Sequence, residues 1–302
     1  MPEPAIDIVH VGSACRDLTE EDPRGWRLGG GASYSALTTA RLGLRTAAVV
    51  GVDPIAASAS ELDLLRAAGV VLHLVELAEG PIFRNRETPE GRVQSWPVHG
   101  QPLPVPDLPE SWWTAGAWSL VPVASELNES WAAVIPPGAF VSVAWQGLLR
   151  RQGPDQLTEK VPPGHSSLLD AADLVGVSRH DLAPDTSIDA VVALLQAGAR
   201  LALTDGHDGG RLYEVLADRG TREVTWEAIP PARVVDPTGA GDVFLAALAA
   251  ATVRPDLTSH AGTGRPTTDL LFAAATASFV VEAPGLLGVP DRVAVLDRLA
   301  MG

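Results

Sequence analysis

The segment VVDPTGAGDVFLAALAAATV, from Val234 to Val253, changes character part-way along its length. It begins with two β-branched residues, passes through Gly239-Ala240-Gly241 and ends in an apolar stretch typical of a buried helix. The first N–H groups of a helix have no intrahelical acceptor, and the helix dipole places about half a positive charge beside them. Small residues let an anion reach those groups directly, so the segment predicts an anion-binding helix N-terminus.

Asp242 follows the small residues and lies in the expected first turn of this helix. The dipole favours a negative charge there, so we expect the pKa of Asp242 to be lowered. A lowered pKa is compatible with a base in phosphoryl transfer, where the position of the base matters more than its basicity. A second interpretation stays open at this point: the segment is only a glycine-rich helix start with an acid that complements the dipole.

The bulk properties of the 302-residue chain exclude several classes of protein. A net charge of −15 repels polyanions, so we expect neither nucleic acid nor a membrane surface as a partner. Cys15 is the single cysteine, which excludes a disulfide framework. Lys160 is the single lysine and follows no glycine-rich loop, so a Walker-type phosphate loop is absent. The N-terminus lacks the pattern of a signal peptide, and we expect a cytoplasmic protein.

Short apolar runs alternate with helical patterns along most of the chain. Alternation of this kind predicts an α/β fold with a parallel sheet that is covered on both faces. The expected strands are 6–11, 46–50, 70–77, 140–143, 174–177 and 201–204. The expected helices include 31–42, 62–68 and 188–196.

Two stretches interrupt this alternation. Residues 81–98 have the pattern of a half-exposed β-hairpin that turns at Pro89-Glu90-Gly91, and a proline-rich connector, 101–109, follows it. Residues 260–268 form a second expected loop, between two apolar helices. We expect a single domain, 1–302, with a β lid formed by 14–28 and 81–99.

The opening segment closely resembles the C-terminal signature of the ribokinase-like, or PfkB, family of carbohydrate and nucleoside kinases. The N-terminal signature of that family is similar to GGGASYSALTTARLG (Gly29–Gly43) followed by AAVVGVD (Ala47–Asp53). The resemblance extends over essentially the whole chain. It implies a doubly wound, mostly parallel sheet with helices on both faces, a small β lid and kinase activity.

The resemblance also implies roles for individual residues. Asp242 would take the proton from the acceptor hydroxyl. The anion hole for the γ-phosphate would be formed by the amides of Gly239, Ala240 and Gly241. Contacts to the acceptor would come from Asp17, in GSACRD, and from the backbone of Gly30 and Gly31.

A second set of residues matches the nucleotide side of the family. In LTDGHDGG, the loop that borders the nucleotide matches at Thr204, Gly206 and Gly209. The family motif N-x-x-E, which organises Mg²⁺ through water, reads Ser178-Arg179-His180-Asp181 and keeps a carboxylate at Asp181. Asp236 and Thr238 match positions that hold a monovalent cation in some members. The implied cofactors are therefore ATP and Mg²⁺, with K⁺ as in those members.

The chain departs from the family pattern in the acceptor region. Tyr34 replaces the sugar-binding Asn of the N-terminal signature, and Ala274 stands where an Asn near the adenine is common. VAWQGLLR (Val143–Arg150) resembles the D-x-Q-G-x-x-R segment of relatives that phosphorylate inositol, with Ala144 in place of the acid. The residues predicted from this region to contact the acceptor are Tyr34, Gln146 and Arg150, with Trp145 as a candidate pocket wall.

These observations favour an ATP-dependent kinase that phosphorylates a hydroxyl of a small polyol or sugar. An inositol-like acceptor leads, and pentoses and hexoses follow. A nucleoside kinase of the same family and a non-catalytic relative that binds nucleotide or sugar remain as alternatives. A nicotinamide enzyme is disfavoured, because Gly12 begins GSACRD rather than G-x-G-x-x-G. A homodimer is expected only by analogy with relatives that dimerise through the lid.

Overall fold

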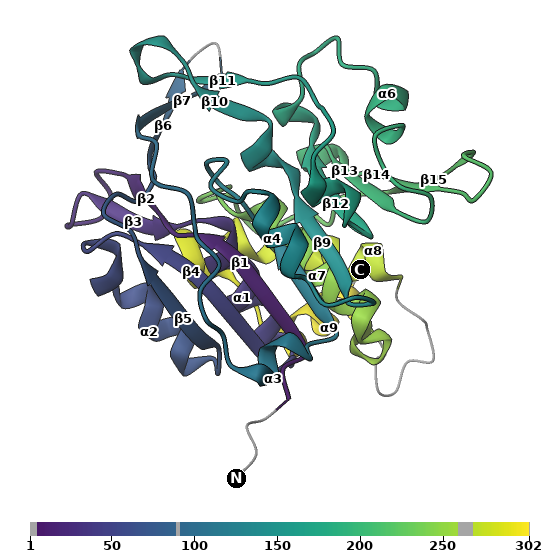
Figure 1. Cartoon of the computed structure of the whole chain (residues 1–302), viewed down its shortest axis with the longest axis horizontal. Coiled ribbons are helices and arrows are strands. Elements are labelled where there is room, and N and C mark those ends of the chain that lie inside the picture. Colours follow the sequence, from purple (N-terminus) through teal and green to yellow (C-terminus); the bar gives the residue numbers. More distant parts are fainter. Residues whose placement is uncertain (1–4, 89–90, 259–267, 302) are drawn as a thin grey trace.

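Nine strands form the central sheet of the computed structural model, which describes residues 5–88, 91–258 and 268–301 (Figure 1). Each strand predicted from an apolar run is present, with ends that differ by no more than two residues. In sheet order the strands are β15 (Thr221–Trp226), β14 (Gly210–Val215), β13 (Arg200–Thr204), β12 (Leu174–Ser178), β9 (Phe140–Ala144), β8 (Ala117–Leu120), β1 (Ile8–Ser13), β4 (Thr46–Val52) and β5 (Val71–Glu76).

The strands from β13 across to β5 are parallel, whereas β14 and β15 run antiparallel at one edge. The chain passes from β1 to β4 and β5 on one side and later fills β8, β9, β12 and β13 on the other. The strand order therefore reverses between β1 and β8, and ligands bind outside the carboxyl ends of strands at such a point. The predicted doubly wound, mostly parallel sheet is confirmed.

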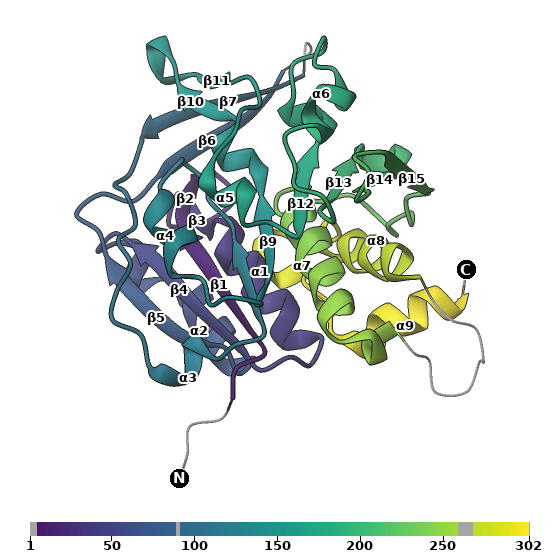
Figure 2. The ribbon, with the colours of Figure 1, turned by 45° about the vertical axis from the view of Figure 1, so that its right-hand side comes forward.

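Helices cover both faces of the sheet and enclose two cores, because successive strand residues point to opposite faces. Ile8 and Val50 belong to one core, and their neighbours Val9 and Val49 belong to the other. The first core includes residues of α1 (Gly31–Arg41), α2 (Ser60–Ala67), α7 (Ala240–Val253), α8 (Asp269–Val280) and α9 (Arg292–Met301), and Figure 2 shows the last three side by side. The second core includes residues of α3 (Glu110–Trp113), α4 (Glu129–Val134), α5 (Ser167–Asp170) and α6 (Ile188–Val192).

The apolar run of the opening segment forms α7, which packs between α1 and α8. Residues from Val243 to Ala251 are all buried, which explains why this helix has no polar face. It starts directly after Gly239, as the sequence predicts, whereas the predicted helix 188–196 ends early, at Val192. Within the described ranges, none of the helices combines the length and the hydropathy that crossing a bilayer requires.

A small sheet stands above one end of the central sheet in Figure 1. Its strand order is β3 (Trp26–Gly29), β2 (Cys15–Leu18), β6 (Ile82–Thr88) and β7 (Gly91–Val98), and the hairpin of β10 (Arg150–Gln152) and β11 (Thr158–Lys160) lies beside it. Strands β2, β6 and β7 and all but the last residue of β3 lie in the segments 14–28 and 81–99, whose role as a lid stays a prediction. The predicted turn at 89–90 and the predicted loop at 260–267 lie outside the described residues.

Candidate active site

The N-terminus of α7 begins with a left-handed residue, Gly239, whose φ is 82°. A Cβ atom at position 239 would lie 2.4 Å from the ring of Tyr34, so both the backbone angle and the packing require glycine. The preceding turn is held by Asp236, whose Oδ1 accepts a hydrogen bond of 3.0 Å from the amide of Thr238. The amide of Ala240 makes only a long bond, of 3.4 Å, to the carbonyl of Pro237.

Gly241 differs from Gly239 because its surroundings are open. Among the described residues, nothing beyond its chain neighbours and the backbone of its own helix lies within 4 Å of a Cβ built at position 241. The residue is exposed, and its N–H group is one of those at a helix start that have no intrahelical acceptor. The predicted anion hole therefore has free space in front of Gly241, where an oxyanion could approach the amides directly.

The glycines at the start of α1 lie against two carboxylates. A Cβ atom at Gly29 would lie 2.1 Å from Asp17 Oδ2, and one at Gly31 would lie 2.9 Å from Asp242 Oδ1. The Gly31 position also lies 3.1 Å from Cβ of Val121, the residue that follows β8. The structure thus brings Asp17 and Asp242 to the two sides of one glycine run, where the strand order reverses.

The environment of Asp242 raises its pKa to about 7. Burial of the carboxyl is the main cause, Arg150 opposes it, and the negative charges of Asp181 and Asp17 add to it. The residue as a whole is partly exposed, whereas its carboxyl is surrounded by protein atoms that remove much of its solvation. The lowered pKa predicted from the helix dipole is therefore wrong, because desolvation and two neighbouring acids outweigh the dipole.

Arg150 is the cation that faces this group of acids. Its Nε donates to the carbonyl of Val123 at 2.8 Å, and its Nη1 donates to Oε1 of Gln94 at 3.1 Å. Its guanidinium carbon lies 4.7 Å from the ring centre of Phe83, a cation–π distance. Burial lowers the pKa of Arg150, and the charges of Asp181 and Asp242 oppose this shift. Because Gln94 and Phe83 lie on β7 and β6, Arg150 joins the small sheet to the surroundings of Asp242.

Gln146 and Asp181, predicted for the acceptor and for Mg²⁺, contact each other. Gln146 Nε2 donates to Asp181 Oδ1 at 2.9 Å, and Asp181 Oδ2 accepts from the amide of Ser178 at 3.2 Å. Each carboxylate oxygen keeps acceptor capacity, so Asp181 fits a hydrated Mg²⁺. No group of three or more His, Cys, Asp or Glu side chains in the described chain is arranged to hold a metal directly. Water and phosphate oxygens would therefore supply most of the ligands.

The predicted nucleotide loop lies beside Asp181. Thr204 ends β13 and pairs in register with Ser178, which ends β12. Gly206 and Gly209 both have positive φ, of 56° and 82°. A Cβ at Gly209 would lie 2.1 Å from the carbonyl oxygen of Trp226, so this glycine is needed for the close approach of two backbones whether or not a ligand binds.

Two aromatic residues that the sequence associates with the acceptor have packing roles. Tyr34 is only 2% exposed and its ring lies against Gly239, while burial raises the pKa of its hydroxyl. Trp145 is 1% exposed and belongs to the second core, so its prediction as a wall of the pocket is wrong. Ala274 is also buried, in the first core.

Comparison with known proteins identifies part of the chain. Residues 145–291 match the family described as "pfkB family carbohydrate kinase". The match covers just under half of the chain. The sequence is also 33% identical to a ribokinase of Arabidopsis thaliana over 148 residues, which are 45% of this chain. That alignment spans 36% of the length of the ribokinase.

Solved structures match the fold outside the stretch 145–291 as well. A pyrophosphate-dependent kinase of the ribokinase family, complexed with a pyrophosphate analogue and myo-inositol, is 18% identical and matches with a TM-score of 0.70 over 95% of this chain and 98% of its own. Arabidopsis thaliana ribokinase, complexed with ribose and ATP, is 24% identical and matches with a TM-score of 0.68 over 98% and 99%. The chain therefore has the ribokinase fold.

Glu126, which lies before the matched stretch 145–291, is a site residue that the sequence alone did not indicate. Its side chain is 3% exposed and accepts hydrogen bonds from the amides of Ser13 at 2.9 Å, Val123 at 3.0 Å and Ala124 at 2.7 Å. Glu126 thereby fixes the Val123 carbonyl that receives Arg150. Two of these partners are local, in the loop that follows β8, whereas the bond to Ser13, at the end of β1, depends on the fold.

Arg27 is a second residue that the sequence did not indicate. Its Nη1 lies 3.6 Å from Asp236 Oδ2, and the same oxygen accepts from the amide of Gly285 at 3.2 Å. Asp236 was predicted, with Thr238, to hold a monovalent cation. Its two carboxylate oxygens accept from backbone amides, and the Arg27 guanidinium forms an ion pair with Oδ2. The positive charge beside Oδ2 disfavours a K⁺ ion bound at this oxygen.

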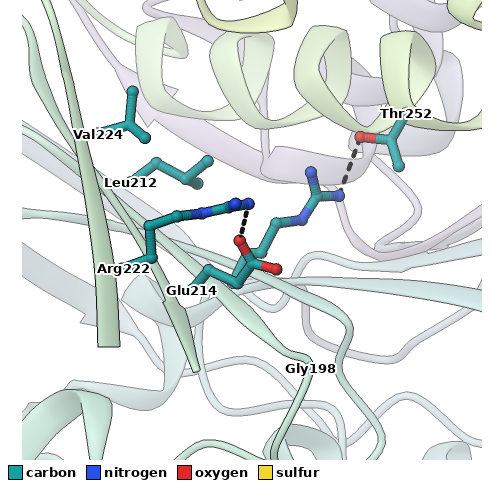
Figure 3. A pocket seen from close by; sticks show the side chains of 7 residues that line it. Gly198, Leu212, Glu214, Arg222, Val224 and Thr252 are labelled. Carbon is teal, nitrogen blue, oxygen red and sulfur yellow. Dashed lines mark hydrogen bonds and ion pairs between the residues drawn. The ribbon is translucent and has the colours of Figure 1, made fainter. Parts of the chain in front are cut away.

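A separate hollow lies far from the carboxylates of Asp17 and Asp242. It has a volume of about 340 Å³ and is lined by residues including Arg200, Glu214, Arg222 and Thr252 (Figure 3). Arg222 pairs with Glu214, and Arg200 donates to Thr252 at 3.0 Å. Arg200 begins β13 and Thr252 is near the end of α7, so this hollow lies at the opposite end of both elements from Thr204 and Asp242.

Proposed function

We propose that the chain is a kinase that transfers the γ-phosphate of ATP to a hydroxyl of a small polyol or sugar. One observation carries the proposal. Asp242, with a pKa near 7, faces the Gly29–Gly31 run at the point where the strand order reverses, beside the open N-terminus of α7. An acid beside a free anion-binding helix start is the arrangement that phosphoryl transfer to an alcohol needs.

The donor phosphates are proposed to lie between the Thr204–Gly209 loop and the start of α7. The amides of Gly239, Ala240 and Gly241 would bind the γ-phosphate and stabilise charge on its equatorial oxygens. Bound Mg²⁺ would neutralise phosphate charge, and Asp181, oriented by Gln146, would hold it through water. Burial and the glycine-lined surface would restrict water near the reacting oxygen.

The acceptor is proposed to lie on the Gly29–Gly31 backbone between Asp17 and Asp242. Asp17 would accept a hydrogen bond from one hydroxyl, and Asp242 would accept the proton of the reacting hydroxyl. The new bond joins the acceptor oxygen to the γ-phosphorus, and the bond to the β,γ-bridging oxygen breaks, leaving ADP. A base with a pKa near 7 is ionised to a useful extent at neutral pH and is basic enough to receive that proton.

The acceptor class is proposed from the polar groups that surround this space. Two acids and Arg150 suit a ligand with several hydroxyls, so an inositol-like polyol leads, and pentoses and hexoses follow. A nucleoside acceptor would need an aromatic or apolar surface for the base. Tyr34 does not supply this surface, since its ring packs against Gly239.

The test is a direct transfer assay with two donors and a panel of acceptors. ATP or pyrophosphate, each with Mg²⁺, is combined with myo-inositol, ribose, fructose or adenosine, and phosphorylated product is measured by mass spectrometry. We expect product with ATP and a polyol or sugar. Absence of product from every pair, together with a nucleotide-induced rise in the thermal unfolding midpoint, would support the non-catalytic alternative. Product with pyrophosphate alone would keep the acceptor chemistry and change the donor.

A further inference from the structure

Arg27 connects the small sheet to the turn that starts α7. It lies on β3, next to the Gly29–Gly31 run, and its Nη1 lies 3.6 Å from Asp236 Oδ2. Both side chains are shielded from solvent, at 18% exposed for Arg27 and 19% for Asp236. The pair joins residues more than two hundred positions apart, so the contact exists only in the folded chain.

The groups that contact the Asp236 carboxylate, two amide donors and one ion-pair partner, come from three segments. Oδ1 accepts from the amide of Thr238, inside the turn that leads into Gly239. Oδ2 accepts from the amide of Gly285, in the 3₁₀ helix Gly285–Gly288, and faces Arg27. The Arg27 side chain passes across this helix, since its Cδ lies 3.8 Å from a Cβ built at Gly285. Asp236 therefore holds the turn, and Arg27 supplies the positive charge beside it.

A small cation at the same oxygen would meet an unfavourable neighbour. The charge on Arg27 would be only a few ångströms from an ion bound to Asp236 Oδ2, and like charges at such distances repel each other even in water. The guanidinium also satisfies the electrostatic need of the carboxylate without an ion. The resemblance implies a monovalent cation at Asp236 and Thr238. In this chain the charge of Arg27 beside Asp236 disfavours that cation.

We propose that Arg27 takes the place of a monovalent cation at Asp236, so that the turn before α7 is held without K⁺. Arg27 is a positioning residue: it acts through Asp236 on the amides of Gly239–Gly241 and does not touch the reacting atoms. Because β3 is a strand of the small sheet, the same contact links that sheet to the anion-binding turn. The kinetic part of this inference rests on the proposed kinase function, and the binding part does not.

The test compares salts at equal ionic strength: potassium chloride, sodium chloride and tetramethylammonium chloride, whose cation is too large to replace a guanidinium hydrogen bond donor. For the wild-type protein we expect the same thermal unfolding midpoint and the same transfer rate in all three salts. For Arg27→Met we expect the rate in tetramethylammonium to fall about tenfold, the order expected when a shielded charge loses its partner. Potassium should then restore at least part of the rate and raise the unfolding midpoint of this variant.

Three further variants separate this role from general loosening of the segment. Arg24→Met removes a neighbouring guanidinium that pairs with Asp22 and Glu61, and it should produce no response to potassium. Glu21→Gln removes the other partner of Arg27 and should leave salt independence intact. Arg27→Lys keeps a positive charge and should also show no response. If Arg27→Met does not fold, Arg27→Gln, which retains an amide donor, replaces it.

A wild-type protein that is stabilised or activated by potassium relative to tetramethylammonium would overturn the proposal. So would a folded Arg27→Met protein whose unfolding midpoint is the same in all salts. The unfolding measurement needs no turnover, so it still decides the matter if the transfer assay detects no kinase activity. Failure of the kinase proposal and failure of the cation proposal are therefore distinguishable.

Discussion

The starts of α1 and α7 are built alike but differ in what their glycines face. Each helix begins after a glycine with positive φ, 97° at Gly30 and 82° at Gly239, and neither has a side-chain cap. At α1, the carboxylates of Asp17 and Asp242 occupy the space beside Gly29 and Gly31. At α7, the space beside Gly241 contains no other atom of the described chain within 4 Å of a Cβ position, its helix backbone and neighbours aside.

Glycine therefore serves a different purpose at the start of each helix. Glycine at the start of α1 lets two segments of the protein approach each other, whereas glycine at 241 has no such partner inside the molecule. A small residue that is not required by packing, at a helix start that favours anions, indicates a position kept clear for a ligand. The five predictions that follow test this difference, first the effects on activity from the largest to the smallest and then the effect on stability.

Asp242→Asn should have the largest effect, because it removes the proposed base and keeps the shape of the side chain. A positioned base contributes about 10² to 10⁴ in rate, so we expect turnover to fall by that factor. Binding of ATP should change little, and isothermal titration calorimetry measures it directly. A variant that phosphorylates at a near wild-type rate would remove Asp242 from the mechanism.

Gly31→Ala should disturb the start of α1, where the Asp242 carboxylate fills the space beside the glycine. The new Cβ would lie 2.9 Å from Asp242 Oδ1 and 3.1 Å from Val121 Cβ, so the carboxylate must move. A displacement of about 1 Å at a reacting group costs about a hundredfold in rate, and we expect kcat to fall by that order together with a lower unfolding midpoint. Gly164→Ala is the control, since a Cβ there meets nothing within 4 Å. An active Gly31→Ala protein would show that Asp242 needs no fixed position.

Gly241→Ala, at the open start of α7, should lower activity without lowering stability. The methyl group meets no atom of the described chain, and alanine is favoured over glycine in a helix, so the unfolding midpoint should stay equal or rise slightly. The same group would crowd the approach of the phosphate, and we expect about a tenfold loss in kcat/KM for ATP. Unchanged kinetics would mean that the phosphate does not pass beside Gly241.

A change of pH near neutrality should have the smallest of these effects on kcat/KM. With a pKa of about 7, Asp242 is mostly protonated below neutrality, so kcat/KM should decrease about tenfold for each unit of pH below 7. Initial rates across this range measure the profile. An activity limb near pH 4 would indicate that burial, Asp17 and Asp181 do not raise the pKa of this carboxyl in solution.

The stability of the fold should also depend on pH, through the ionisation of Asp242. The folded pKa of about 7 lies above the ordinary value of 3.8, so the folded state binds the proton more tightly than the unfolded state. Asp242 therefore destabilises the fold increasingly as pH rises between these values. Asp242→Asn should raise the unfolding midpoint, with a gain that grows over this range and is constant above it.

The sequence predicted those parts of the molecule that depend on local pattern. Continuous apolar runs such as Leu174–Ser178 identified buried parallel strands, and the Gly239–Gly241 signal located the start of α7. Strands β8, β14 and β15 were not predicted. AWSL in β8 is short, and GRLYEV in β14 carries charges at the antiparallel edge, so neither resembles a buried apolar run.

The features that could not be predicted depend on contacts between distant segments. The pKa of Asp242 is raised mainly by burial, and Asp181 and Asp17 add to the shift; all three causes depend on segments that the fold brings together. Arg27 reaches Asp236, and Glu126 accepts from the amide of Ser13 at the end of β1, over more than a hundred residues of sequence in each case. Local pattern identifies candidate groups, whereas their charge states depend on the tertiary structure.

Arg150 gives the small sheet a thermodynamic connection to proton binding. Gln94 of β7 holds the guanidinium, and the same guanidinium lowers the pKa of Asp242. Linkage is reciprocal, so any displacement of β7 that carries Arg150 away makes Asp242 hold its proton more tightly. Loss of that proton, in turn, favours the arrangement in which β7 keeps Arg150 in place.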